Sequence, residues 1–321
     1  MTLLQHLLHL TNFKSPLLRT LVPSVSAVIA IQTAFAVPSI AAQSDRFYDF
    51  SGALTYVAVS ALSLYLPVLR GKVLASGQTA AAYGNKAGGL GLGMGLGMGW
   101  NWRQVVLSGA VCLWAVRLGT YLFSRVLQEG KDSRFDKIKT SPSRYAVAYA
   151  VQAVWISVCA LPVIAVNAVP AAAFAGMGLR VTDLLGLGLF VGGITIEAVA
   201  DAQKARWLGE KRGKVHDEQF LTRGLWSKSR HPNYFGESTL WTGIATAAAG
   251  VLVSSPVRAA LGLSPAAALA VCFASPAFVT FLLLRVSGVP LSEKKYDKRF
   301  GDNKEYLEWK RNTPKFFPKL F

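Results

Sequence analysis

Charged side chains are scarce in this sequence of 321 residues, of which 16% are charged and 52% are hydrophobic. A soluble chain of ordinary composition carries about 25% charged residues. The shortage falls on the acidic side, because 17 Asp and Glu stand against 34 Lys and Arg and give a formal net charge of +17. This composition excludes an ordinary soluble domain. It predicts a surface that faces lipid and cationic loops on one side of a membrane.

Cysteine is also sparse, and no cluster of metal ligands accompanies it. Cys112, Cys159 and Cys272 lie far apart within apolar segments and form no Cys-x-x-Cys pair. We therefore expect neither a disulfide framework nor a metal site. The basic residues lie between long apolar runs and not on a soluble domain, which argues against nucleic acid as a partner. Membrane lipids are the partner that this pattern favours, and no obligate protein partner follows from it.

The first twenty residues lack the basic, apolar and small-residue succession of a cleavable secretory signal. They are apolar but interrupted by His6, His9, Lys14 and Arg19, so we expect a short interfacial helix or a disordered lead. The absence of acidic residues there is compatible with a mitochondrial transit peptide, although arginines are few. We expect an integral protein of the endoplasmic reticulum, with a mitochondrial membrane as the alternative.

Long apolar runs are what the sequence has in abundance. A membrane-spanning helix needs about 20 mostly apolar residues. Seven stretches meet this requirement, near residues 21–42, 51–69, 105–127, 145–166, 181–200, 237–253 and 266–286. We expect an all-α fold, a multi-pass transmembrane bundle of about seven spans within a range of roughly six to eight. The run after Glu237 is short and rich in alanine, and it could be partly re-entrant.

Basic residues cluster in the loops 129–144 and 201–230 and in the C-terminal tail. Loops on the opposite side of a seven-span bundle would hold far fewer, so the positive-inside rule places the tail and the loop 201–230 in the cytoplasm. The run 90–100 alternates glycine with leucine or methionine. It favours a flexible loop over a helix contact.

Ionisable side chains inside apolar runs are costly in a membrane and mark candidate sites. Arg117 lies in the middle of such a run, where it has either a function or a structural partner. Glu197, Asp201 and Lys204 follow at helical spacing and share one helix face. They indicate the wall of a polar cavity. The alternative is a helix that leaves the membrane, which would account for Lys204 better than for Glu197.

The segment 224–243, GLWSKSRHPNYFGESTLWTG, holds the densest group of polar side chains. A cation, an imidazole, an amide, a phenol and a carboxylate occur within eight residues at a membrane boundary: Arg230, His231, Asn233, Tyr234 and Glu237. Backbone N–H groups at a helix start, together with an arginine, would favour a phosphate. The alternative is an ordinary His-Pro-Asn turn before a helix, but the combination favours a site.

The C-terminal tail interleaves aromatic and basic residues. Tyr296, Phe300, Tyr306 and Trp309 alternate with lysines and arginines. A surface helix on anionic lipid would have this composition. So would a lid whose rings stack on a nucleotide, and composition does not separate the two.

Four motifs resemble, in the same order, the DUF1295 branch of the steroid 5-alpha-reductase-like superfamily. They are RLGTYLFSRVLQEGKDSRFD, EAVADAQK, SRHPNYFGE and the pair KYDKRFG and YLEWKRNTPKFFP. We therefore treat 1–104 as a divergent N-terminal membrane region with a glycine-rich insertion and 105–321 as a steroid-reductase-like membrane domain. The resemblance implies a helix bundle with NADPH in a cytosol-facing cavity. It also implies reduction of a carbon–carbon double bond in a sterol or another lipid.

The same resemblance implies roles for individual residues. It implies cofactor binding by one set of side chains: Arg117, Asp201, Lys204, Arg230, His231, Asn233, Tyr296 and Arg299. Tyr234 and Glu237 become the catalytic candidates, with Tyr234 acting as a proton donor or as a hydrogen-bond partner of the cofactor.

One feature of the steroid enone reductases is lacking, namely their N-terminal Gln-Glu-Leu-Pro-type carboxylate motif. The polar run QSDRFYDF around Asp45 could line a lipid pocket instead, or merely cap a loop. A second function is a membrane methyltransferase of the isoprenylcysteine or phospholipid type, which shares the Arg-His-Pro-x-Tyr-x-Gly turn and uses S-adenosylmethionine. A third is a non-enzymatic membrane scaffold that has kept the fold.

Overall fold

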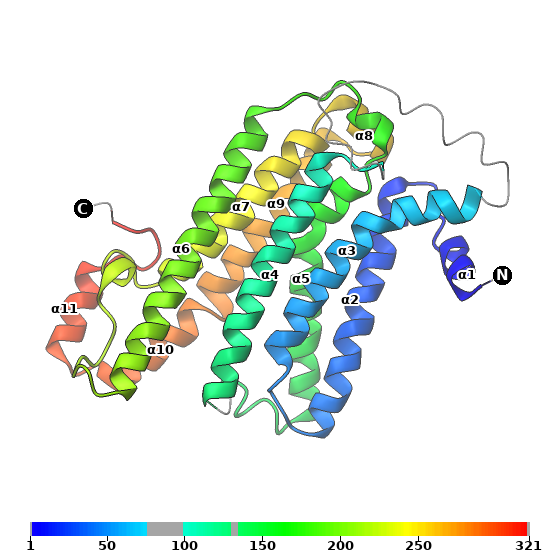
Figure 1. Ribbon diagram of the computed structural model, residues 1–321. Coiled ribbons are helices and arrows are strands. Elements are labelled where there is room, and N and C mark those ends of the chain that lie inside the picture. The colour runs from blue at the N-terminus through cyan, green and yellow to red at the C-terminus, as the bar shows by residue number, and fades with distance from the viewer. Residues whose placement is uncertain (1, 76–98, 130–133, 320–321) are drawn as a thin grey trace. The chain divides into compact units, whose positions relative to one another are not determined.

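The structure is a computed structural model that describes residues 2–75, 99–129 and 134–319. These residues form helices and no strand (Figure 1), which confirms the all-α expectation. Most of the glycine-rich run 90–100 lies outside the described residues, so the loop expected there stays a prediction.

The long helices account for most of the described chain. They are α2 (Pro16–Ala41), α3 (Tyr48–Ala75), α4 (Trp102–Glu129), α5 (Pro142–Asn167), α6 (Val181–Arg212), α7 (Pro232–Leu252) and α9 (Pro265–Phe281). The shorter ones are α1 (Leu3–Leu10), η1 (Ala171–Phe174), η2 (Gly224–Ser227), α8 (Ser255–Leu261), η3 (Leu282–Val286), α10 (Val289–Phe300) and α11 (Lys304–Asn312). Of the two alternatives for the N-terminus, a short helix or a disordered lead, the helix α1 agrees with the first.

Six helical segments of the described chain are long and apolar enough to cross a membrane. They are α2 to α6 and the segment Pro265–Phe300. The helices α7 and α8 make a seventh if they count as one span, because they meet at a bend of 89°. The prediction of about seven spans is therefore confirmed. The bend follows the alanine-rich run that was expected to be partly re-entrant. The candidate spans together indicate an integral membrane protein.

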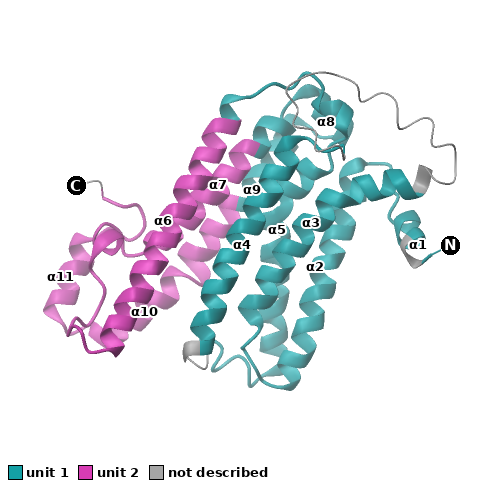
Figure 2. Cartoon of the chain, viewed as in Figure 1, with its two compact units in different colours: residues 1–182, 248–275 teal, residues 183–247, 276–321 magenta. Residues whose placement is uncertain are grey.

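The chain divides into two compact units (Figure 2), and the first comprises residues 1–182 and 248–275. Small and polar side chains hold its helices together, as in many membrane bundles. The Gln32 amide donates to Thr55 Oγ1 at 2.8 Å, and Asn167 donates to Ser63 Oγ and Ser108 Oγ at 2.9 and 3.0 Å. These contacts join α2 to α3 and α5 to α3 and α4 within the buried part of the unit.

The polar run around Asp45 lies at one end of this first unit, where α2 connects to α3. The Asp45 carboxylate pairs with Lys139 at 3.0 Å, and Asp49 pairs with Arg134 at 2.7 Å. The Tyr145 hydroxyl donates to the carbonyl of Ser44 at 2.8 Å. These contacts link the connection between α2 and α3 to residues 134–145. They agree with the alternative in which the polar run caps a loop.

The second unit comprises residues 183–247 and 276–321, and glycines set the approach of its helices α6 and α7. A Cβ added at Gly193 would lie 2.5 Å from the backbone nitrogen of Leu240, and one at Gly243 would lie 2.5 Å from the carbonyl oxygen of Gly186. Only glycine therefore permits this backbone contact. The contact brings Asn233, at the start of α7, beside Asp201 of α6, with Asn233 Nδ2 3.3 Å from Asp201 Oδ1.

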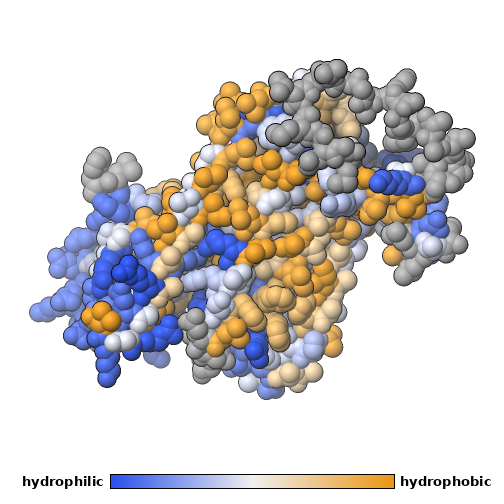
Figure 3. Space-filling model, viewed as in Figure 1, coloured by the Kyte–Doolittle hydropathy of each residue, from blue (hydrophilic) through white to orange (hydrophobic). Residues whose placement is uncertain are grey.

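The C-terminal tail of the second unit is fastened to the segment just before α7. The backbone N–H of Arg230 donates to the carbonyl of Pro314 at 2.9 Å, and Ser229 Oγ donates to the carbonyl of Phe316 at 2.8 Å. The N–H of Lys319 donates to the carbonyl of Lys228 at 2.9 Å. We call residues 313–319 the C-terminal strap. Hydrophilic residues gather over the neighbouring helices α10 and α11 (Figure 3).

Candidate functional site

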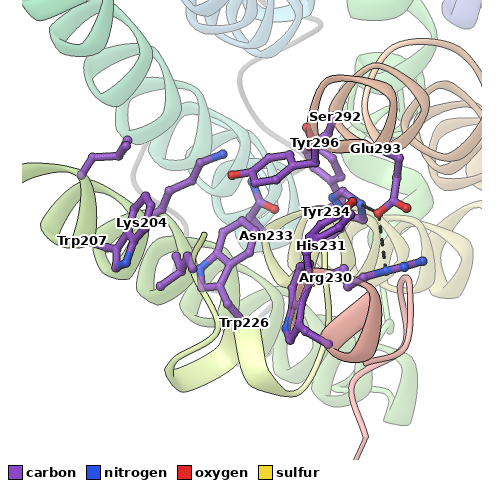
Figure 4. Close-up of a pocket in the computed structure, with 14 residues that line it drawn as sticks. Lys204, Trp207, Trp226, Arg230, His231, Asn233, Tyr234, Ser292, Glu293 and Tyr296 are labelled. Carbon is purple, nitrogen blue, oxygen red and sulfur yellow. Dashed lines mark hydrogen bonds and ion pairs between the residues drawn. The ribbon is translucent and has the colours of Figure 1, made fainter. Parts of the chain in front are cut away.

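A pocket opens in the second unit, between α6, the start of α7, α10 and α11 (Figure 4). It measures about 600 Å³ when its opening to solvent is included. Its polar lining consists of Lys204, Arg230, His231, Asn233, Tyr234, Ser292, Glu293, Tyr296 and Tyr306. Its apolar lining consists of Trp207, Leu208, Leu221, Trp226 and Trp309.

Local sequence explains how the turn before α7 forms. Pro232 begins α7, and proline suits the first turn of a helix because its missing N–H would have no intrahelical partner there. Arg230 and His231 precede the helix, and these residues are 8% and 4% exposed. Upstream, Gly224 adopts a φ of +60°, a left-handed conformation that glycine takes without strain.

The short helix η2 carries Trp226 into the pocket wall. The Trp226 indole N–H donates to the carbonyl of Ala200 at 3.0 Å, which fixes the ring against α6. The ammonium of Lys204 lies 5.3 Å from the centre of this ring. The pair places a cation and an aromatic face side by side, an arrangement that stabilises the cation through the ring's electron density.

Glu293 of α10 forms the polar centre of the opposite wall. Its Oε1 lies 3.0 Å from His231 Nε2 and 3.4 Å from Arg230 Nε, and its Oε2 lies 3.5 Å from Lys310 Nζ. The His231 ring stacks on Tyr234 with 5.4 Å between ring centres and 7° between planes. One carboxylate thus contacts three basic side chains from the start of α7 and from α11.

Burial governs the protonation of His231. It lowers the pKa of His231 below its ordinary value near 6.5, although the hydrogen bond and charge of Glu293 act in the opposite direction. The ring is therefore neutral at pH 7. Because a carboxylate can only accept a hydrogen bond, the proton of the neutral ring lies on Nε2, and Nδ1 is its acceptor nitrogen.

Apart from Arg230 Nε, which is ion-paired with Glu293, two buried polar atoms of the pocket residues have no hydrogen-bond partner among the described residues. They are Oδ1 of Asn233 and the indole Nε1 of Trp309. Buried polar atoms are usually paired, and leaving one unpaired costs about 1–3 kcal/mol. A ligand that offers one donor and one acceptor would satisfy both atoms.

The structure brings together many of the residues that the sequence singled out. Lys204, Arg230, His231, Asn233, Tyr234 and Tyr296 line the pocket. Asp201 is buried behind Asn233, its hydrogen-bond partner. Glu237 is buried further along α7 and does not line the pocket. Arg299 is exposed and lies over the ring of Phe300. Arg117 lies on α4, in the first unit, and its cofactor role stays a prediction, as do the roles of the others.

Glu293 is the charged pocket residue that sequence reasoning missed. It stands in the tail among many charged residues, and 62 positions separate it from His231. No motif around Glu293 distinguishes it from the acidic residues that follow it, so only the folded arrangement of α10 against the start of α7 identifies it.

Comparison with known proteins and protein families gives one match. Among curated proteins and among solved structures, no match was found. The model of a family described as a protein of unknown function, DUF1295, matches residues 89–313, which includes every residue that lines the pocket. Because this match spans more than half of the sequence, the chain belongs to the DUF1295 family.

Proposed function

We propose that the protein binds NADPH in this pocket and uses it to reduce a carbon–carbon double bond in a sterol or another lipid. The observation that carries the proposal is the lining of the pocket, where basic side chains and aromatic rings share one hollow at the ends of the apolar helices α6 and α7. NADPH combines anionic phosphates with flat rings, so it complements both features.

The residues present fit this cofactor. Lys204 and Arg230 would hold phosphate groups, and the indoles of Trp226 and Trp309 offer faces for stacking. The unpartnered Asn233 Oδ1 and Trp309 Nε1 offer an acceptor and a donor to the amide and hydroxyl groups of such a ligand. When bound, NADPH would supply the hydride.

The chain itself would supply orientation, a proton and exclusion of water. Tyr234 lines the pocket and is held by the stacked ring of His231, so its hydroxyl is the proton donor that we favour. The indoles and Leu208 and Leu221 would displace water from the reacting groups. A lipid substrate suits a pocket at the end of spanning helices, because its apolar part can remain in the bilayer.

One observation favours a second function, the S-adenosylmethionine-dependent methyltransferase. Glu293 is the only carboxylate that lines the pocket in the described chain, and it lies among aromatic rings. Aromatic faces attract cations such as a sulfonium, and a carboxylate would attract the ligand's ammonium group. The direct test must therefore compare the two cofactors.

Thermal unfolding of the purified full-length chain in detergent separates the functions. NADPH at about a hundred times its dissociation constant should stabilise the protein by about 2.7 kcal/mol and raise its melting temperature by several degrees. S-adenosylmethionine at the same concentration should leave it unchanged. The reverse preference would contradict the reductase and support the methyltransferase, and stabilisation by neither would support the scaffold.

A second test addresses the reaction. Cells that lack the protein should accumulate an unsaturated sterol or lipid precursor, and re-expression of the wild-type chain should remove it. Profiling of total lipids with and without the protein measures this directly. An unchanged ratio of unsaturated to saturated species would contradict the proposed reaction, even if NADPH binds.

A further inference from the structure

The C-terminal strap leaves an aromatic side chain exposed on a backbone that is held on both sides. Ser229 Oγ donates to the carbonyl of Phe316 at 2.8 Å, and the N–H of Lys319 donates to the carbonyl of Lys228 at 2.9 Å. Phe317 stands between these two bonds and is 72% exposed, whereas Phe316 is buried. The exposure of Phe317 is therefore a built feature of the strap and not the result of a loose chain end.

The strap lies at the level where the apolar parts of the helices in the second unit end. The ring centre of Phe317 lies 5.8 Å from that of Phe235, in the first turn of α7. The turn at the start of α7 contacts Asp201, which follows the apolar run of α6, and Glu293, which follows the last apolar run. These contacts place Phe317 at the boundary between membrane and water, where the apolar side chains of interfacial segments enter the lipid surface.

The strap is also cationic. It carries Lys315 and Lys319, both exposed, and no acidic residue. Within the described chain neither lysine is paired with a carboxylate, and Lys319 Nζ donates to the carbonyl of Asn312 at 3.2 Å. The half-buried Lys228 adds a third positive charge beside the strap. The nearby cations that do have acidic partners, and are therefore not counted, are Arg230 and Lys310.

We propose that the C-terminal strap docks on the anionic surface of the lipid bilayer, with the ring of Phe317 among the lipids and the ammonium groups of Lys315 and Lys319 on the headgroups. The ring gains by leaving water, and the cations are attracted by anionic headgroups. Because the strap is bonded to Ser229 and to the N–H of Arg230, docking also holds the turn that begins α7. This docking is independent of which cofactor the pocket binds.

The experiment uses the full-length protein in lipid nanodiscs of two compositions, phosphatidylcholine alone and an equal mixture of phosphatidylcholine and phosphatidylserine. Hydrogen exchange is measured at the amide N–H groups of Arg230 and Lys319, because both form the bonds that join the strap to the segment before α7. The N–H of Gly301, bonded to the carbonyl of Asp297 at 2.9 Å at the end of α10, is the internal control.

We expect exchange at Arg230 and Lys319 to be slower in the anionic discs, on the order of tenfold, because the two lysines of the strap favour a negative surface. Exchange at Gly301 should be the same in both. Salt at about 1 M should remove the difference, since it shortens the screening length to about 3 Å. Equal exchange in the two kinds of disc would overturn the docking on anionic lipid and leave this surface to a protein partner. Slowing that includes Gly301 to the same extent would overturn it too, because the lipid would then act on the whole chain.

Matched variants test the lysines. The double variant Lys315→Gln/Lys319→Gln should exchange at the same rate in both kinds of disc. Lys298→Gln/Lys304→Gln removes the same net charge from exposed positions of α10 and α11 and should keep the wild-type difference. An equal loss in both double variants would overturn the assignment to the strap. The comparison of the two discs uses the wild type alone, so it decides the docking even if a variant does not fold.

Phe317→Trp tests the position of the ring. The eight tryptophans of the wild type give the baseline fluorescence, and the additional signal reports on position 317. We expect a nitroxide attached to the lipid to quench this additional signal, and iodide in the water to quench it weakly. Strong quenching by iodide with none by the lipid nitroxide would overturn the placement of the ring among the lipids.

Discussion

At the scale of single residues, some polar groups of the pocket wall have ion-pair or hydrogen-bond partners, and others have no hydrogen-bond partner among the described residues. Glu293 is compensated by three basic side chains, whereas the indole Nε1 of Trp309 is buried without a partner among the described residues. The Trp226 indole, by contrast, donates to a carbonyl of α6. We therefore assign a structural role to the indole N–H of Trp226 and a ligand-binding role to that of Trp309.

Trp309→Phe should therefore weaken NADPH binding with little loss of stability. The change removes an unpaired donor, which costs the fold nothing, but it removes a hydrogen bond to the ligand of about 1 kcal/mol, or roughly fivefold in affinity. Trp226→Phe is the matched control, because it breaks the bond to Ala200 and should lower the free energy of unfolding by about 1 kcal/mol. Titration with NADPH and thermal unfolding measure the two effects. Equal affinity in Trp309→Phe and wild type would show that the indole donor does not face the ligand.

His231 makes stability depend on pH. Burial lowers the pKa of folded His231 below the value near 6.5 that it has in the unfolded chain. Between these two pKa values the unfolded state binds more protons than the folded state. The contribution of His231 to the free energy of unfolding is therefore fully present above about pH 6.5, and it falls as the pH is lowered through this window. Melting temperatures from about pH 8 to pH 5 should decline more steeply in the wild type than in His231→Gln. Parallel curves for the two proteins would contradict this contribution.

At the scale of helices, the contact between α6 and α7 positions one wall of the site. It depends on glycines that allow backbone to approach backbone, and it brings Asn233 beside Asp201. A larger side chain at the contact would separate the helices and change the distance between Lys204 and the start of α7. The packing of this helix pair is therefore coupled to the geometry of the pocket.

Gly193→Ala should destabilise the second unit by about 1–3 kcal/mol, because the new Cβ would lie 2.5 Å from the Leu240 nitrogen. It should also weaken NADPH binding. Gly209→Ala on the same helix is the control, because its Cβ would meet nothing within 4 Å. Alanine favours a helix over glycine by up to about 1 kcal/mol, so this variant should be as stable as the wild type or more so. Equal melting temperatures for the two variants would show that the close contact is unimportant.

The sequence predicts the helices well and the pocket in part. Apolar runs are local, so the spans could be located before any contact was known, and the pocket residues from Arg230 to Tyr234 lie in one short segment. Glu293 escaped prediction because its partners are distant in sequence. The tail could not be interpreted from composition, since α11 turns Tyr306 inward, 1% exposed, and leaves Leu307 outward, 44% exposed. Which face of a short helix is buried depends on tertiary packing.

At the scale of the whole molecule, the distribution of charge determines orientation. The net charge of +17 comes largely from residues 201–230, which include the end of α6, from the C-terminal tail and from residues 129–144. Basic loops remain on the cytoplasmic side of a membrane. We therefore expect the opening of the pocket to be reached from the cytosol, where NADPH is available.

A tag at the C-terminus should accordingly be accessible to antibody in cells whose plasma membrane alone has been permeabilised. A tag placed in the connection between α8 and α9 should be protected, because it lies at the far end of the last span. Fluorescence microscopy after selective permeabilisation measures both, and full permeabilisation reveals both tags as a positive control. Protection of the C-terminal tag would contradict the orientation.

The C-terminal strap also has a consequence for biogenesis. Residues 313–319 are synthesised after every candidate spanning helix of the described chain, yet they hold the segment that carries Arg230 and His231. The spanning helices can enter the membrane before the strap has been synthesised, but this end of the pocket cannot be completed until the strap has left the ribosome. A premature stop after Asn312 would thus leave every span in place and yield a protein that reaches its membrane without a finished site.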